Sequence, residues 1–258
     1  MTTIFLGALF DLPHVLYIIL SLLATIIIIR TLSQKMKTPS QKNKGLLFFG
    51  LITFFLHISI LWYDFFRTGQ SIAPDNVIFP IYFCNMSMYL LLFVSLVTNK
   101  NSKWMSYLLT ITAYSGIFGA LISLFYPSYY LGAEGMLLWP VFKSMLSHST
   151  MLIGCLWILV SKMTPIKVSN AVVYFIGLLG FGLIGIVVNS LFRAFDLYAP
   201  NAMYLQHPPL SDVPFLNVFV ISFLMVLFIF IFTHIYDSLV NPKEQRWYKQ
   251  IKSYSSSK

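Results

Sequence analysis

The stretch PHVLYIILSLLATIIIIRTL at residues 13–32 is followed at once by SQKMKTPSQKNK at residues 33–44. A helix of about 20 residues, rising 1.5 Å per residue, crosses the ~30 Å hydrocarbon core of a bilayer. The second stretch holds four lysines and no acidic residue, and such basic segments stay on the cytoplasmic side of a membrane. Together the two stretches predict a membrane helix whose N-terminus lies outside the cytoplasm.

The rest of the chain repeats this pattern, since 58% of its 258 residues are hydrophobic and only 10% are charged. A soluble domain carries roughly a quarter charged residues, so a water-soluble fold is excluded. The apolar runs predict an all-α, seven-helix transmembrane bundle that forms one domain over residues 1–240. The spans are expected at 13–32, 45–66, 78–98, 104–125, 137–160, 169–192 and 213–237.

Positive charge sets the expected orientation of the bundle. If Arg30 at the end of the first span is counted with the loop after it, 14 of the 17 Lys and Arg residues follow odd-numbered spans, which places those segments and the C-terminus in the cytoplasm. Residues 241–258 then form a basic cytoplasmic tail. The net charge of +9 is a topology signal and does not indicate a nucleic-acid partner.

The N-terminal segment and the composition indicate where the protein resides. Residues 1–12 contain no Lys or Arg, and no cleavage pattern follows the first span, so a cleaved signal peptide is not expected. The abundance of Ile, Lys, Asn and Phe is typical of a bacterial source. We therefore expect a multi-pass protein of a bacterial cytoplasmic membrane.

Polar side chains inside the spans are candidates for function, because each is costly in hydrocarbon unless it faces a partner or a cavity. From the helical rise, Cys84 should lie ~9 Å and His148 ~16 Å below the outer boundary. Candidate substrate-binding residues in the same outer half are His57, Asn85, Lys143, Ser144, Asn189 and Arg193. These groups could line one cavity that opens to the outer leaflet. No metal site and no cofactor are predicted.

Structural alternatives exist for several of these residues. Cys84 could be a small packing residue, and His148 could bond to a serine or a carbonyl between helices. Lys143 could extend to the lipid headgroups instead of binding a phosphate. Cys155 should lie ~27 Å below the outer boundary, too deep for a disulfide with Cys84, because bridged Cα atoms lie within about 7 Å.

Three segments carry a family resemblance: FPIYFCNMSMYL at 79–90, AYSGIFGALISLFYP at 113–127 and SMLSHSTML at 144–152. They resemble the YwaF-like bacterial membrane proteins, a family similar to the animal transmembrane protein 164 family. The shared pattern is a Pro-x-x-x-Cys-Asn start to one helix and a Ser-x-x-x-His segment two helices later. The segment NAMYLQHPP at 201–209 resembles the family's Asn-Tyr-x-x-Leu-x-x-x-Pro segment but separates Asn201 from Tyr204 by two residues.

The resemblance implies a lipid acyltransferase in which Cys84 accepts an acyl chain from one phospholipid and passes it to a lysophospholipid, with His148 assisting. Membrane lipids would then be both substrates and partners. In this scheme Asn85 or Ser144 donates to the developing oxyanion, and Lys143 or Arg193 holds a phosphate.

Other functions fit the same polar residues. The chain could be a lipid or small-molecule transporter or binding protein, or a non-catalytic accessory protein. A retinal-binding receptor is excluded because the seventh expected span contains no lysine. Paired intramembrane carboxylates, which proton-coupled carriers often use, are also absent from the sequence pattern.

Overall fold

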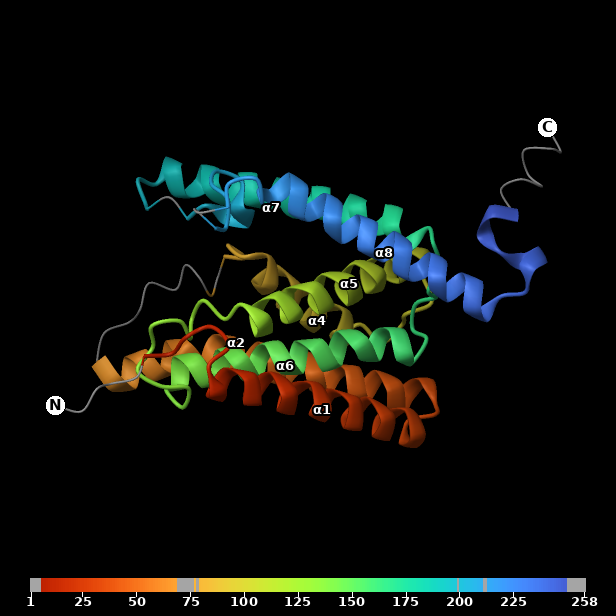
Figure 1. The fold of residues 1–258 in the computed structure, drawn as a ribbon, viewed down its shortest axis with the longest axis horizontal. Helices are drawn as coiled ribbons and strands as arrows, with labels where there is room; N and C mark the ends of the chain where they lie inside the picture. Colours follow the sequence, from red (N-terminus) through yellow and green to blue (C-terminus); the bar gives the residue numbers. More distant parts are fainter. Residues whose placement is uncertain (1–5, 69–76, 78, 199, 211–212, 250–258) are drawn as a thin grey trace. The chain divides into compact units, whose positions relative to one another are not determined.

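The computed structural model of the chain describes residues 6–68, 77, 79–198, 200–210 and 213–249, without the side chains at 64, 65, 67 and 68. All regular structure in the described part is helical (Figure 1). The helices are α1 (Leu12–Lys35), α2 (Pro39–Thr68), α4 (Phe83–Leu96), α5 (Lys103–Phe125), α6 (Trp139–Val160), α7 (Asn170–Ala194) and α8 (Val218–Val240), with the 3-10 turns η1 (Ala202–Tyr204) and η2 (Lys243–Gln245). Six helices are long and apolar enough to cross a membrane, and α4 is a shorter apolar helix. The predicted all-α membrane fold is confirmed.

Helix α4 begins at Phe83, later than the expected span boundary at residue 78. The backbone of Ile81 bonds to Phe79 across Pro80, and Tyr82 is extended, so a turn precedes the helix. With 14 residues, α4 is about 21 Å long, less than the thickness of the hydrocarbon core. The expected exterior loop at 67–77 lies almost entirely outside the described residues.

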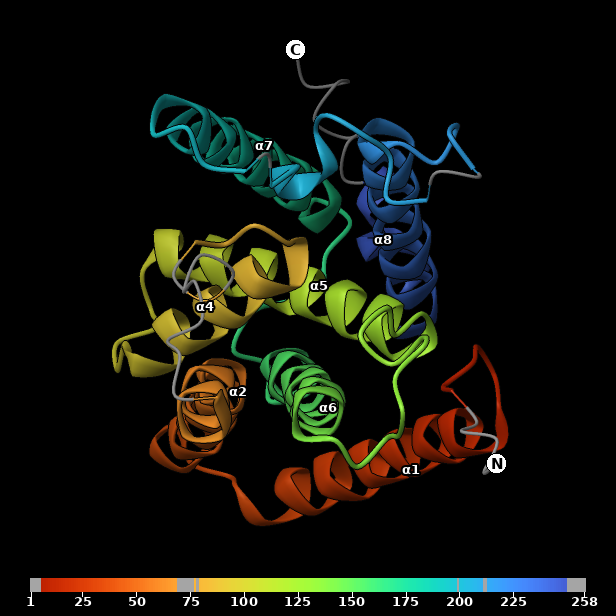
Figure 2. The ribbon, with the colours of Figure 1, turned by 90° about the vertical axis from the view of Figure 1, so that its left-hand side faces the viewer.

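The chain divides into two compact units, residues 1–163 and 164–258. In the first unit α6 packs against α1, α2, α4 and α5, and Figure 2 shows it next to α2 and α5. The apolar window of α6 is 72% buried, against 22% for α1, so α6 forms the core of this unit. In the second unit α7 packs against α8 and η1. The single domain over residues 1–240 stays a prediction.

Hydroxyl groups join the helices of the first unit. Tyr17 and Ser21 of α1 each hydrogen-bond the Ser149 hydroxyl of α6 at 3.0 Å. The Thr53 hydroxyl of α2 donates to that of Thr150 on α6 at 2.9 Å. Because lipid tails are as apolar as the helix surfaces, the hydrophobic effect does not drive helices together inside a membrane. Hydrogen bonds of this kind help to hold them together there.

Helices α5 and α6 approach closely at Gly116, where an added Cβ atom would overlap Cys155 Sγ. We expect Gly116→Ala to lower the free energy of unfolding by about 1–3 kcal/mol, because fully buried Cys155 has no room to move. In the double variant with Cys155→Ala the overlap is gone, so the loss should be smaller than the sum of the single losses by about 1 kcal/mol. Unfolding by SDS titration in mixed micelles measures this, and strictly additive losses would contradict the contact.

A hydrogen-bonded cluster ties the start of α1 to the loop between α5 and α6. Asp11 caps α1 by accepting from the His14 N–H at 2.9 Å, and it accepts from the Tyr130 hydroxyl at 2.7 Å. Burial opposes charge on Asp11, but the hydrogen bonds from Ala8, Tyr130 and His14 outweigh it and lower the pKa of this carboxyl. Burial, together with the Asp11 carboxylate, raises the pKa of Tyr130 to about 12. The cluster fixes the loop that carries Tyr129.

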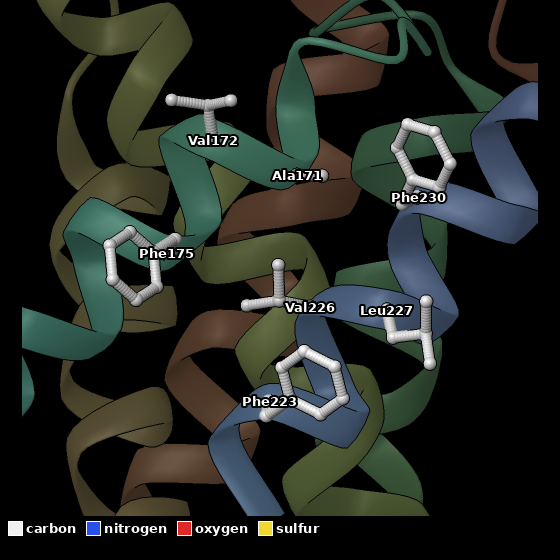
Figure 3. A pocket seen from close by; sticks show the side chains of 7 residues that line it. All are labelled: Ala171, Val172, Phe175, Phe223, Val226, Leu227 and Phe230. Carbon is white, nitrogen blue, oxygen red and sulfur yellow. The ribbon is translucent and has the colours of Figure 1, made fainter. Parts of the chain in front are cut away.

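The second unit contains an apolar cavity of about 330 Å³ between α7 and α8 (Figure 3). It is lined by Ala171, Val172, Phe175, Phe223, Val226, Leu227 and Phe230. These side chains carry no polar atom, so the cavity is lined by hydrocarbon alone.

The described part of the expected C-terminal tail folds back on α8. The Trp247 backbone N–H donates to Asp237 Oδ2 at 3.2 Å, and its indole N–H donates to His234 Nδ1 at 2.8 Å. Residues 250–258 of the expected tail lie outside the described residues.

Candidate functional site

Cys84 occupies the second position of α4 and is partly exposed. Its Sγ donates to Asn85 Oδ1 at 3.5 Å, and the backbone N–H groups of Cys84 and Asn85 and the Ser123 side chain lie within hydrogen-bonding range of the sulfur. The first turn of a helix presents N–H groups and a positive dipole end, which stabilise negative charge. Helix α4 therefore places the thiol beside hydrogen-bond donors at the positive end of the helix dipole.

The neighbouring helix α5 makes room for this thiol. An added Cβ at Gly119 would contact Cys84 Cα at 3.4 Å and Cys84 Cβ at 3.5 Å, so the two backbones lie close together. Ser123 follows Gly119 by four residues and thus lies on the same face of α5. Gly119 and Ser123 therefore both lie on the side of α5 that faces Cys84.

His148 lies on α6 and is 4% exposed. Its Nδ1 is 2.6 Å from the Ser144 carbonyl oxygen. Because a carbonyl only accepts, Nδ1 must carry the proton, and Nε2 holds a lone pair in the neutral ring. This Nε2 atom is buried with no hydrogen-bond partner among the residues that the structure describes. Nε2 of the neutral ring is therefore an unused hydrogen-bond acceptor.

Lys143 connects the thiol with two histidines. Its ammonium donates to the backbone carbonyl of His57 on α2 at 3.5 Å. It also interacts electrostatically with Cys84, His57 and His148. The side chain thus reaches these interior groups, and stabilisation of a nearby anion is the role that its position favours.

Tyr129, in the loop before α6, is a second link between Cys84 and His148. Its ring stacks on the His148 ring with 5.8 Å between centroids and 11° between planes, and it interacts electrostatically with Cys84. Burial, with Tyr17 and Cys84 nearby, raises the pKa of Tyr129, so the hydroxyl stays protonated. That hydroxyl donates to the Ser123 carbonyl at 3.0 Å. Lys143 and Tyr129 therefore each interact with both proposed reactive residues.

His57 extends the site toward α2. It is 8% exposed, its Nε2 has no partner within the described part of the chain, and its ring meets the edge of Tyr89 at 5.9 Å. The Tyr89 hydroxyl is likewise buried without a hydrogen bond to a described residue. These atoms offer hydrogen bonds to a polar group that enters the interior of the unit.

The structure gives Asn85 and Ser144 distinct positions. Asn85 is buried, and its side chain accepts the thiol hydrogen bond. Ser144 acts on His148 through its backbone carbonyl, which also accepts from the Ser147 hydroxyl at 2.8 Å. The Ser144 carbonyl thus orients the imidazole, which agrees with the alternative that His148 bonds to a carbonyl, although this carbonyl belongs to α6 itself.

Asn189 and Arg193 lie on α7, in the second unit. The Asn189 amide bonds to both backbone groups of Ala202, at 2.8 Å to the nitrogen and 3.3 Å to the oxygen, and so holds the segment that contains η1. Arg193 is exposed in the last turn of the helix. Their assignment to the same site stays a prediction.

Ser123, Tyr89 and Tyr129 were not assigned a role from the sequence. Ser123 lies inside the quoted segment 113–127 and Tyr89 inside 79–90, so the resemblance already pointed near them. Tyr129 lies between the expected spans, where polar residues were not considered. Within the described residues no group of three His, Cys, Asp or Glu side chains is placed to hold a metal ion.

A comparison with family models gives a match to the TMEM164 family over residues 9–236. No curated protein and no solved structure matches the chain.

Proposed function

The chain belongs to the TMEM164 family, and from this premise we propose that it is an acyltransferase that moves fatty acyl chains between membrane phospholipids through a thioester on Cys84. It is a multi-pass membrane protein, and we assign it to the cytoplasmic membrane of a bacterium. The observation that carries the proposal is that Lys143 and Tyr129 each interact with both Cys84 and His148, whose Nε2 has no hydrogen-bond partner among the described residues.

In the first half of the reaction His148 Nε2 takes the Cys84 proton, directly or through one water. The thiolate attacks the ester carbonyl carbon of a phospholipid, with Lys143 and the first turn of α4 stabilising the negative charge. The C–O ester bond breaks, and the departing lysophospholipid alkoxide takes the proton from the imidazolium. Cys84 is left as an acyl-thioester.

The second half reverses these steps with a different lysophospholipid. His148 Nε2 takes the proton of the acceptor hydroxyl, whose oxygen attacks the thioester carbon. The C–S bond breaks, and the thiolate recovers its proton from the imidazolium. An ester is consumed and an ester is formed, so the cycle needs no cofactor and no energy source.

Three further residues have roles in this proposal. We assign Asn85 and Ser123 to hydrogen bonding of the carbonyl oxygen, because both already lie next to Cys84 Sγ. His57 would bind a polar group of the substrate through Nε2.

The direct test is transfer between distinguishable lipids. The purified protein in mixed micelles is incubated with a phospholipid that carries a deuterated acyl chain and with a lysophospholipid of a different headgroup. Mass spectrometry should detect the deuterated chain on the second headgroup, together with the lysophospholipid of the donor. If folded protein gives no transfer with any donor and acceptor headgroup but binds lipid saturably, a transport or binding function replaces the enzyme.

A further inference from the structure

A second polar site lies at one end of the first unit, where α1 ends, α2 begins and α6 ends (Figure 1). A cavity of about 240 Å³ opens there. Its lining includes Ser33, Lys37, Lys42, Trp157, Ser161 and Lys162. We propose that this cavity binds the phosphate group of an anionic phospholipid in the cytoplasmic leaflet.

The charge of the cavity favours an anion. Three of its lining residues are lysines and none is acidic. The Lys42 ammonium donates to the Ser161 carbonyl at 2.9 Å, and the Lys37 ammonium donates to the Ser33 carbonyl at 2.6 Å. Each ammonium has three N–H groups, so both keep donors for a ligand. Like charges held around one cavity repel each other, and a bound anion relieves that repulsion.

Lys162 occupies a backbone conformation that favours glycine. Its φ is +59°, and the bonds from Lys162 N–H to Leu159 and from Met163 N–H to Ile158 close the C-terminus of α6 around it. Glycine is the usual residue at such a helix end, because a side chain is strained there. A strained residue held in place by its surroundings is a pointer to function. Here the strained backbone places the exposed Lys162 side chain at the cavity.

The floor of the cavity is tightly packed. Trp157 is fully buried, and its indole N–H donates to the Lys42 carbonyl at 3.1 Å. An added Cβ at Gly45 would lie 2.8 Å from Met36 Sδ and 3.2 Å from Trp157 Nε1, so Gly45 lets both side chains close in. Lys42 is therefore held in a fixed position before any ligand arrives.

Apolar lining and location favour a lipid as the source of the phosphate. Met36 and Val160 also line the cavity, and Val160 is exposed, so apolar surface adjoins the lysines. The positive-inside rule places this end in the cytoplasmic headgroup layer. Basic pockets between membrane helices on that side bind lipid headgroups. Lys42 precedes His57 by 15 residues on α2, or ~22 Å, so this site is separate from the Cys84 site.

The test measures lipid binding to the full chain by native mass spectrometry from detergent. Phosphatidylglycerol should bind more tightly than phosphatidylcholine, and the triple variant Lys37→Gln, Lys42→Gln, Lys162→Gln should bind phosphatidylglycerol at least about ten-fold more weakly. The matched control, Lys35→Gln, Lys44→Gln, Lys103→Gln, removes the same charge from residues predicted to face the cytoplasm. It should change the affinity less than about three-fold.

A second variant addresses stability. Lys162→Gly removes one charge and also the backbone strain, so it should keep or raise the thermal unfolding midpoint while weakening phosphatidylglycerol binding. Equal losses of phosphatidylglycerol affinity in the cavity variant and its control would show that binding depends only on general surface charge. That result would overturn the proposal. Unchanged binding in the cavity variant would overturn it as well. If inorganic phosphate displaces the lipid at equal concentration, the ligand is a soluble phosphate and not a phospholipid.

Discussion

Replacing Cys84 with alanine is expected to reduce acyl transfer to the background rate, a loss of roughly 10⁴-fold or more. The proposed cycle passes through a bond between Cys84 Sγ and the acyl carbon, and the substitution removes the atom that forms this bond. The first-turn N–H groups of α4 and the Lys143 ammonium also interact with the sulfur. Neither can stabilise the methyl group of alanine in its place. Initial rates of labelled acyl transfer in mixed micelles measure the loss.

Cys155→Ala provides the matched control, because the chain contains only these two cysteines. Cys155 is fully buried against Gly116, so its substitution should lower stability without touching the reaction. Cys84→Ser should also be inactive or nearly so, since a hydroxyl is a weaker nucleophile than a thiol in the same position. Transfer at an undiminished rate by folded Cys84→Ala protein would rule out the thioester pathway.

His148→Gln is expected to lower kcat by about 10²–10⁴-fold, the range that a general acid and base contributes. Glutamine can still donate an amide N–H to the Ser144 carbonyl, but its amide cannot take and return a proton. The substitution should also slow alkylation of Cys84 by iodoacetamide, because the thiol loses its base. Rate measurements with lipid and with iodoacetamide give two independent readouts.

The control for this variant is His207→Gln. His207 is exposed, and its hydrogen bonds with Asn201 use only the backbone N–H and carbonyl of His207, so the same substitution there should leave both rates unchanged. If His148→Gln retains the wild-type kcat and the wild-type alkylation rate, the imidazole is a packing residue between helices.

Hydropathy was sufficient to predict the helices of this fold, because a membrane span must be apolar throughout and about 20 residues long. It could not locate the start of α4, since Phe79, Pro80, Ile81 and Tyr82 are as apolar as the helix that follows. Whether such a run is helical depends on local backbone bonds, here the turn from Phe79 to Ile81.

The site was predictable only in part. Polar residues inside the expected spans were chosen as candidates, and four of them lie in the first unit: Cys84, His148, Lys143 and His57. Tyr129 could not be found in this way, because its role depends on a loop folding back over His148. The lysines predicted to be cytoplasmic carried a topology signal in the sequence, which contains nothing to indicate that three of them surround one cavity.

The measurement that tests the central claim most directly is the intact mass of the protein after incubation with phospholipid and no acceptor. We predict a single added acyl chain on the peptide that contains Cys84, removable by neutral hydroxylamine, absent from Cys84→Ala and present in Cys155→Ala. Phospholipid turnover by the wild-type protein with no acyl adduct on Cys84 would contradict the account.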